Sequence, residues 1–556
     1  MGFIGRSLLV LSVLYGLLFA VVDVFLLRGG APMWAGVAFV FAIIGVQYLA
    51  APWLIEWFFS IDWDPEALPQ AQRVFVENLC RERGLPPIKL GVIWSGTPNA
   101  FAFGRVRRDA RIVVTEGILK NLSNDEINAV LAHEVGHVAH YDFAVMALAA
   151  ICPLLLYQIY VWTDRVNNLR LVSYAAYLAY WVGQFLVLLL NRTREYGADH
   201  FSAQVTREPS ALSSALVKIA YGMIRETSES RRMLQEGADK TDKNNAKRAL
   251  QFGHSLSLMG IAAASGGEAL ALVANTPDAA AKVMRWDLVN PWSRVYELGS
   301  THPLTAMRLK ALNREAASYG QQPEYPLPSD TRIRWTGFPL QFLIWAAPLL
   351  CGFTVLSYVW IRKPLRELGF VAPDNFIPVL LIALGISWAA RIAYRYRGAF
   401  KPATVADLLE DLDVSQMQPR AVELEGEIIG HGIPGAVWSA DLVLQDASGM
   451  IFVYYRSSIP FGRFFFAVRN ADRLIGERVK LRGWYRRGLR PYVEVSSVQA
   501  TLLKASPRSA GTSLFSAEAL SAPMEKEDFL TRSYSVWIQL AASAVCVGAG
   551  LYIIFG

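Results

Sequence analysis

The segment His133-Glu134-Val135-Gly136-His137 decides how this chain is interpreted. On a helix, two histidines four residues apart lie on one face, so both imidazoles can reach a single metal ion. Glu134 follows the first histidine and can face a metal-bound water without binding the metal, as a general base must. The pattern predicts a catalytic zinc site with one Zn²⁺ per chain, provided that a third ligand exists.

The residues before this segment predict the helix that carries it. Ser123-Asn124-Asp125-Glu126 matches the S-x-x-E capping box, and apolar residues follow it at helical spacing. An amphipathic helix with surface histidines is the alternative interpretation of the pentapeptide. This alternative is weakened because the helix is flanked by apolar residues and runs into a hydrophobic segment.

Several side chains are candidates for the third ligand. His140 lies on nearly the same face as His133 but roughly 10 Å along the helix axis, so it cannot easily join both histidines on one ion. His200, His302 and Glu195 remain candidates.

Glu195 has a physical advantage over the two histidines. Asp199 follows it by four residues, so the aspartate could hydrogen-bond a ligating imidazole while the glutamate binds zinc. The alternative is that Glu195 forms a buried structural ion pair with Arg192 or Arg194.

The composition indicates a multi-pass membrane protein. Of 556 residues, 53% are hydrophobic and only 18% are charged, which is too hydrophobic for an array of soluble domains. The hydrophobic residues are concentrated in seven segments of the length that a helix needs to cross a bilayer. We interpret the first as an anchor rather than a signal peptide. The segments are Ser7–Leu27, Met33–Leu54, Phe143–Trp162, Leu171–Leu190, Trp335–Ile361, Phe376–Tyr394 and Tyr534–Phe555.

The net charge of +7 is explained by the basic flanks that membrane segments need, so nucleic acid is not expected as a partner. No CxxC pair occurs among the four cysteines, which predicts neither a disulfide framework nor a thiolate metal site. Three long polar segments, 62–142, 191–334 and 395–532, share one side of the membrane if the spans between them form hairpins. Arginines flanking that side predict that it is cytoplasmic.

Two β-rich regions are predicted, one before the HEVGH segment and one in the last third of the chain. Ile88–Trp94 and Arg111–Thr115 bracket Asn99–Gly104, which predicts a small antiparallel sheet. Further on, alternating runs separated by glycines within Val422–Ala500 predict a small, OB-like β-barrel. Arg194–Ala203 and Pro209–Ile224 are predicted helices, Arg225–Arg248 is predicted to be a solvated loop, and we find no internal repeat.

These observations predict a fold class and a division into domains. We expect a multi-pass α-helical membrane protein with a mainly α, zincin-type peptidase domain that carries a small β-sheet. The predicted parts are a transmembrane hairpin (1–59), the peptidase domain (60–334) interrupted by a hairpin (143–190), a third hairpin (335–394), the barrel (395–505), a linker (506–533) and a last transmembrane helix (534–556).

The sequence resembles the HtpX-like integral-membrane zinc metallopeptidases, relatives of the CAAX prenyl proteases. Four motifs carry the resemblance in the same order as in that family. They are Pro98-Asn99-Ala100-Phe101, the HEVGH segment, Arg194-Glu195-Tyr196-Gly197-Ala198-Asp199 after a two-span hairpin, and His302-Pro303 with Arg308. Everything beyond about Ala317 lies outside the resemblance.

The resemblance implies roles for individual residues. His133, His137 and Glu195 would bind zinc in a gluzincin-like site, and Glu134 would activate water. Asp199 and Arg308 would support the ligands from behind, and His302 would lie close to the site, stabilising the oxyanion. Asn99, Ala100 and Phe101 would belong to an edge strand onto which an extended substrate adds. An ordinary hairpin strand is the alternative for that segment.

The predicted function is that of an endopeptidase acting on membrane-associated or misfolded proteins, a protein quality control role, in a bacterial inner membrane with the site facing the cytoplasm. Its partners are protein substrates and the lipid bilayer, and no oligomeric state is predicted. The alternatives are a CAAX-type processing protease, a non-catalytic membrane scaffold and a transporter. Few charges lie within the predicted spans, which speaks against a transporter. An oligonucleotide surface at Arg482–Arg490 is a minor alternative for the barrel.

Overall fold

The computed structural model describes residues 33–164, 169–219, 277–328, 331–367, 376–431, 441–457, 463, 466, 474–488, 491–501, 528–532 and 535–555. The predicted first span, Ser7–Leu27, and the predicted loop Arg225–Arg248 lie outside these residues. The chain divides into two compact units, described separately below. The first unit comprises Met1–Gly267 and Val295–Ser329, and the second comprises Glu268–Arg294 and Asp330–Gly556.

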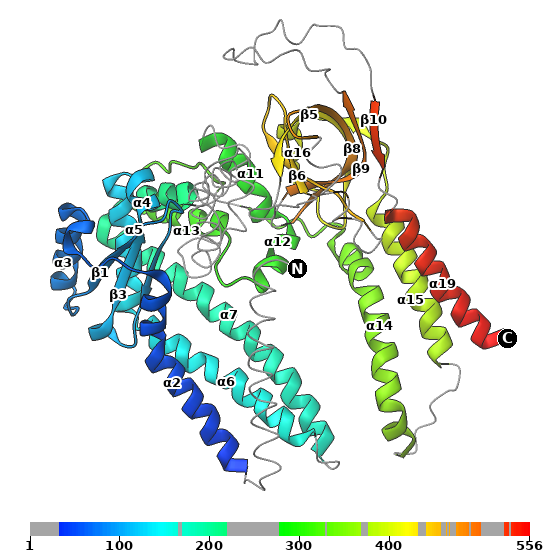
Figure 1. The fold of residues 1–556 in the computed structure, drawn as a ribbon, viewed down its shortest axis with the longest axis horizontal. Coiled ribbons are helices and arrows are strands. Elements are labelled where there is room, and N and C mark those ends of the chain that lie inside the picture. Colours follow the sequence, from blue (N-terminus) through cyan, green and yellow to red (C-terminus); the bar gives the residue numbers. More distant parts are fainter. Residues whose placement is uncertain are drawn as a thin grey trace, which may run out of the picture. The chain divides into compact units, whose positions relative to one another are not determined.

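A three-stranded sheet lies at one end of the first unit (Figure 1). Its order is β1 (Lys89–Ile93), β3 (Arg111–Thr115) and β2 (Ala100–Phe103), so β2 is an edge strand as predicted. The predicted antiparallel sheet is wrong in one respect, because β1 and β3 pair in parallel while β2 and β3 pair antiparallel. The cause is that β2 and β3 form the hairpin, after which β3 runs beside β1 in the same direction.

Helices complete the polar part of the first unit. They are α3 (Gln70–Glu82), α4 (Glu116–Asn121), α5 (Asn124–Ala139) and α13 (Thr305–Ser318). Of these, α4 and α5 contact the sheet, α3 packs on α5, and α13 packs on α7 (Arg170–Thr206). The predicted capping box at the start of α5 is confirmed, since Ser123 and Glu126 bond each other's backbone N–H groups. Almost every residue of α5 from Glu126 to Val138 is buried, so its histidines are not surface histidines.

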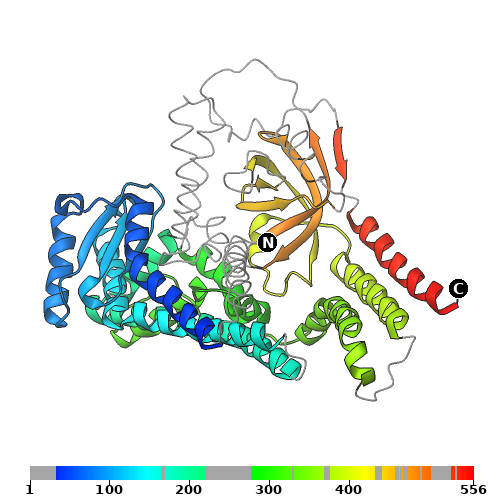
Figure 2. The same cartoon turned by 60° about the horizontal axis from the view of Figure 1, so that its bottom comes forward.

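Three long helices of the first unit follow the predicted hydrophobic segments. They are α2 (Met33–Phe59), α6 (Asp142–Thr163) and α7 (Arg170–Thr206), and α6 lies beside both of the others (Figures 1 and 2). At 37 residues, α7 is about 55 Å long and exceeds the hydrocarbon thickness of a bilayer by far. Its C-terminal part therefore extends from the membrane into the polar part of the unit.

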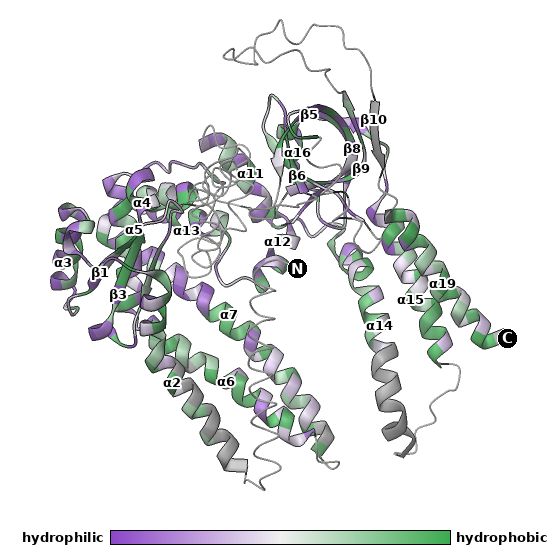
Figure 3. Ribbon diagram, viewed as in Figure 1, coloured by the Kyte–Doolittle hydropathy of each residue, from purple (hydrophilic) through white to green (hydrophobic). Residues whose placement is uncertain are grey.

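Among the described residues, four helices are long and apolar enough to cross a membrane: Asp142–Thr163, Val172–Thr206, Phe376–Arg395 and Val536–Ile554. Two of them belong to the second unit, where hydrophobic residues run along α15 (Phe376–Arg395) and α19 (Ser535–Phe555) (Figure 3). The helix α14 (Phe338–Glu367) occupies the fifth predicted segment. Large apolar side chains on these helices, such as Phe353 and Val545, are 70% exposed, as expected of side chains that face lipid.

A five-stranded closed barrel forms the rest of the second unit (Figure 2). Its strands pair in the ring β5-β6-β7-β9-β8, and β8 closes the ring by pairing with β5. Two further strands extend the sheet, with β4 beside β5 and β10 beside β9. The strand β10 lies within the range that was predicted to be a linker (506–533). The bounds are β4 (Lys401–Pro402), β5 (Arg420–His431), β6 (Asp441–Gln445), β7 (Met450–Tyr454), β8 (Arg478–Arg487), β9 (Pro491–Thr501) and β10 (Asp528–Arg532).

Two short helices close the barrel's apolar core. Three residues of α16 (Val405–Leu409) and Val283 of α11 (Pro277–Val289) belong to the same buried cluster as the inward-facing strand residues. The Trp286 indole of α11 also donates a hydrogen bond to the Val414 carbonyl. The helix α12 (Pro291–Leu298) follows α11 directly.

Strand β8 carries the arginines that sequence reasoning considered for oligonucleotide binding. Arg486 and Arg487 are buried inside the second unit, and Arg482 is paired with Glu423 at 2.6 Å. Two arginines of this segment are therefore not accessible to an oligonucleotide, whereas the Arg482 side chain is 55% exposed and Arg490 lies outside the described residues.

Candidate metal centre

Two helices, α5 and α7, bring the candidate ligands together. His133 and His137 lie one turn apart on α5, and Glu195 lies on the part of α7 that extends beyond membrane length. Gly136 allows the two helices to approach closely, since a Cβ at this position would lie 3.2 Å from Ala198 Cα and 3.3 Å from the Phe201 side chain. The glycine inside the HEVGH segment therefore sets the distance between the ligand-bearing helices.

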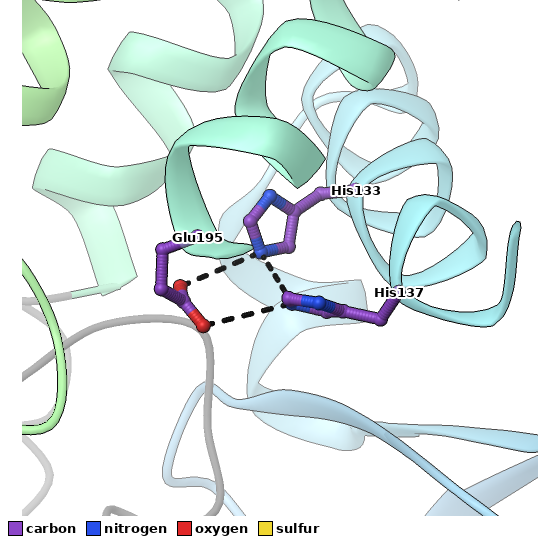
Figure 4. A group of neighbouring side chains, drawn as sticks. All are labelled: His133, His137 and Glu195. Atoms are coloured by element: carbon purple, nitrogen blue, oxygen red, sulfur yellow. Dashed lines mark hydrogen bonds and ion pairs between the residues drawn. The ribbon is translucent and has the colours of Figure 1, made fainter. Parts of the chain in front are cut away.

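The three side chains point at a common centre (Figure 4). The Nε2 atoms of His133 and His137 are 3.2 Å apart. Oε2 of Glu195 lies 3.7 Å from His133 Nε2, and Oε1 lies 3.6 Å from His137 Nε2. All three residues are buried.

This geometry fits a metal ion. Ligand atoms about 2.0–2.1 Å from a tetrahedral ion are about 3.3 Å from one another, close to the spacings between these three groups. Two imidazole nitrogens and one carboxylate oxygen would also leave a fourth position for water, as a hydrolytic metal site requires.

A carboxylate and a guanidinium support the first histidine from behind. Oδ1 of Asp199 lies 3.0 Å from Nδ1 of His133, which directs the opposite ring nitrogen toward the centre. Arg308 of α13 holds Asp199 in turn, through Nε to Oδ2 at 2.8 Å and Nη2 to Oδ1 at 2.6 Å. Its Nη1 also lies 3.4 Å from Oε2 of Glu195, so one buried arginine orients two acidic side chains.

Asp142 supports the second histidine in the same way, and sequence reasoning missed it. Its Oδ2 lies 2.6 Å from Nδ1 of His137, and Nε of Arg194 lies 2.9 Å from its Oδ1. A signal existed in the sequence, because an aspartate five residues after the second histidine is close enough to fold back on it if the helix ends between them. Arg194 thus pairs with Asp142, whereas Arg192 bonds the carbonyls of Glu297 and Ser300.

The two histidines differ in their affinity for protons. Burial lowers the pKa of His133 to about 4, although Asp199 opposes the shift. Burial would also lower the pKa of His137, but the hydrogen bond to Asp142 and the carboxylates of Glu195 and Glu134 outweigh it and raise this pKa above its ordinary value. His133 is therefore neutral down to a lower pH than His137, at which a proton competes with a metal up to a higher pH.

Glu134 is buried beside the ligands without belonging to the cluster of ligand atoms. Burial raises the pKa of its carboxyl group to about 7, against the effect of His137 and of a hydrogen bond from the backbone N–H of Ala102. A carboxyl group with a pKa near the working pH is suited to accept a proton from water and then release it. The Ala102 contact also places β2 directly beside the site.

His302 lies next to the candidate ligands in the loop before α13. Its Nδ1 is 3.2 Å from Oε2 of Glu195. The Ser300 hydroxyl fixes the loop by donating a hydrogen bond to the His302 carbonyl at 2.7 Å. The two remaining candidate histidines lie elsewhere: His140 packs edge-on against Phe201, and the largely exposed His200 pairs with Glu315.

The predicted substrate strand presents one backbone edge to the site. Asn99 exchanges hydrogen bonds with Thr115 of β3, and the Phe101 side chain packs into the core beside Phe59 and Val113. Because backbone groups alternate in direction along a strand, Ala100 and Ala102 direct theirs away from β3. The contact from Ala102 to Glu134 agrees with this direction.

Comparison with known proteins identifies the family. Residues 69–316 match the model of Peptidase family M48. A "Protease HtpX homolog" of Methanothermobacter thermautotrophicus is 38% identical over 38% of this chain and 84% of that protein. Another, of Moorella thermoacetica, is 33% identical over 34% of this chain and 68% of that protein. The solved structure titled "Crystal Structure of S. mikatae Ste24p" aligns over 55% of this chain and 65% of that chain, with 18% identity and a TM-score of 0.31.

The family implies a metal, and the residues of this chain fit one. The matched range contains His133, Glu134, His137 and Glu195, and it also contains two helices of membrane length, α6 and α7. The chain therefore belongs to Peptidase family M48 and is a membrane metalloprotease.

Proposed function

We propose that the protein is a zinc endopeptidase with a gluzincin-like site, in which His133, His137 and Glu195 bind one Zn²⁺. The observation that carries the proposal is the convergence of two Nε2 atoms and a carboxylate, 3.2–3.7 Å apart, beside the buried Glu134. Two histidines and a glutamate are a donor set that catalytic zinc sites use. When bound, zinc would lower the pKa of a water molecule and polarise the peptide carbonyl.

The protein's own residues would perform the proton transfers and hold the substrate. Glu134 would take a proton from the attacking water and pass it to the leaving amine, which its pKa of about 7 favours. His302, 3.2 Å from Glu195, would donate a hydrogen bond to the developing oxyanion. Asp199, Arg308 and Asp142 would keep the ligands in place.

The substrate would bind as an extended strand along the free edge of β2. Asn99 and Phe101 would hold that strand on β3 and on the core, while the carbonyl oxygens of Ala100 and Ala102 would accept hydrogen bonds from the substrate backbone, since their N–H groups donate to Asn99 Oδ1 and to Glu134. Main-chain pairing tolerates many side chains, which suits an enzyme that acts on misfolded or membrane-associated proteins as a class. Because its side chain is buried in the core, Phe101 would hold β2 in position and would not itself contact the substrate.

The proposed location is a plasma membrane with the site on the cytoplasmic side. Its support is the set of arginines at the polar ends of the spans, among them Arg192, Arg194, Arg395 and Arg397. For the barrel, five closed strands of mixed direction support an OB-like assignment.

Metal exchange on the purified full-length protein tests the proposal. We expect that a chelator abolishes cleavage of an unfolded protein, that Zn²⁺ restores it, and that mass spectrometry finds cuts at internal peptide bonds. Cleavage that continues in protein shown to be free of metal would contradict the zinc mechanism. Release of terminal residues alone would contradict the endopeptidase assignment.

A further inference from the structure

A cavity of about 460 Å³ lies within the second unit, far along the chain from the HEVGH segment. Its lining comes from the end of α15, the start of α19 and the residues that follow β7. The lining residues are Trp388, Arg391, Ile392, Arg395, Tyr396, Arg456, Ser457, Ile538, Gln539 and Ala542.

The packing of α15 against α19 places this cavity at one end of two membrane-length helices. A Cβ at Gly385 would lie 2.6 Å from Val547, and a Cβ at Gly550 would lie 2.7 Å from Ile382, so the helices touch closely and run antiparallel. The C-terminal end of α15 therefore meets the N-terminal end of α19. Polar residues begin at this level and Trp537 is 71% exposed there, as is typical of the membrane surface.

Of the described residues that line the cavity, three are arginines and none is acidic. Glu494, a buried carboxylate nearby, accepts a hydrogen bond from the Tyr396 hydroxyl at 2.5 Å and lies 2.8 Å from Nε of Arg486. Arg395 and Arg456 of the cavity lie farther from it, at 3.8 and 3.7 Å. Among the described residues, Glu494 thus contacts both Arg395 and Arg456 of the cavity, in addition to Arg486.

Arg391 adds a third cation to the lining. Among the residues that the structure describes, it makes no ion pair, and the positive charges that act on it are those of Arg395 and Arg456. Within the same described part of the chain, the Nε atom of Arg395 is buried without a hydrogen-bond partner. Like charges held this close in a half-enclosed space favour the binding of an anion beside Arg391 and Arg395.

The remaining walls are apolar. Ile392, Ile538 and Ala542 line the cavity on the side of the helices, and Trp388 lies one turn before Ile392 on α15. A ligand that satisfies both sets of residues has an anionic, hydrogen-bond-accepting group joined to a hydrophobic part. Phosphate esters with acyl chains have this character, and arginine forks match phosphate oxygens well.

We propose that this cavity binds the phosphate group of an anionic membrane phospholipid, with Arg391, Arg395 and Arg456 on the phosphate and the acyl chains along α15 and α19. Free inorganic phosphate offers the same oxygen atoms but has nothing to place on the apolar walls. Bound lipid would anchor the second unit at the membrane surface.

Native mass spectrometry of the full-length protein in detergent tests the proposal, with phosphatidylglycerol and phosphatidylcholine as probes. We expect the wild type to bind phosphatidylglycerol in preference to phosphatidylcholine, and Arg391→Gln to weaken phosphatidylglycerol binding about fivefold. Arg391→Lys, which keeps the charge, should retain most of the preference. Arg397→Gln is the matched control, because Arg397 lies at the same end of the helix but stacks on Tyr394 and does not line the cavity.

Three results would overturn the proposal. The first is a wild type without preference for the anionic lipid. The second is equal weakening by Arg391→Gln and Arg397→Gln, which would indicate general attraction to a charged surface. The third is displacement of the lipid by inorganic phosphate at comparable concentration, which would assign the site to the free anion. A melting temperature measured for each variant separates loss of binding from loss of folding.

Discussion

Oδ2 of Asp142 lies 2.6 Å from Nδ1 of His137, and Asp142 is the first residue of the membrane-length helix α6. Tyr141, with a φ of 56°, turns the chain sharply between the end of α5 and the start of α6. The orientation of one proposed metal ligand is therefore linked to the position of a candidate transmembrane helix. Arg194 of α7 holds the other oxygen of the same carboxylate, so two membrane-length helices meet behind His137.

Asp142→Asn tests this link. The amide keeps the shape of the side chain but removes the charge that favours the metal-binding tautomer of His137, so we expect zinc affinity to fall about 10- to 100-fold. Competition with a fluorescent chelator measures the affinity. Asp164→Asn, at the other end of α6, is the control and should leave the affinity unchanged. Equal affinities for Asp142→Asn and the wild type would remove Asp142 from the site.

Gly136→Ala tests the close approach of α5 and α7. The new methyl group would meet Ala198 Cα and Phe201 at 3.2–3.3 Å, so the helices must separate, at a cost of about 1–3 kcal/mol. We expect a lower melting temperature and weaker zinc binding. Gly197→Ala is the matched control, because its Cβ would meet only His140, at 3.7 Å, and alanine favours the helix. A stability loss of the same size in both variants would contradict the packing argument.

Arg308→Lys tests the arginine that orients Asp199 and Glu195. Lysine keeps the positive charge but cannot form the paired contacts to both oxygens of Asp199. We expect lower zinc affinity and a lower melting temperature than in Arg314→Lys, which changes an exposed residue of the same helix. If both variants behave like the wild type, charge alone and not the forked geometry holds the acidic side chains.

Zinc binding should also depend on pH in a definite direction. The pKa of His137 is raised, so in metal-free protein this side chain holds a proton at pH values where a free histidine has lost it. Zinc must displace that proton, and apparent affinity should fall about tenfold for each pH unit below this pKa. In Asp142→Asn, zinc affinity should begin to fall only at a lower pH, because the variant lacks the carboxylate that raises the pKa of His137. A pH-independent affinity between pH 5 and 8 would contradict this account.

The sequence predicts the centre of the site well because helical spacing alone determines which side chains share a face. His133, Glu134 and His137 need only α5 to be a helix, and the capping box indicates where that helix begins. Glu195 depends on a contact between distant helices, so spacing could only favour it over His200 and His302 through Asp199 four residues later, and the family resemblance then singled it out. Asp142 was missed because its approach to His137 depends on the left-handed turn at Tyr141, which no periodicity encodes.

The two sheets illustrate the same limit. Alternation locates β1, β2 and β3, but it does not state the direction in which neighbouring strands run, so the parallel pair was not predicted. In the barrel, Arg486 and Arg487 resembled an exposed basic surface. They are buried because Glu494 and backbone carbonyls, including those of Leu409 and Val283, satisfy their guanidinium groups. Partners of this kind become visible only in three dimensions.

The most direct test of the central claim combines zinc content and proteolysis in Glu134→Gln. Because we propose that Glu134 moves protons and does not hold the metal, we predict that the purified variant contains as much zinc as the wild type. Its cleavage of an unfolded substrate should fall by at least about 100-fold. Glu116→Gln, in the neighbouring helix α4, should match the wild type in both respects. Undiminished proteolysis by zinc-loaded Glu134→Gln would contradict the account.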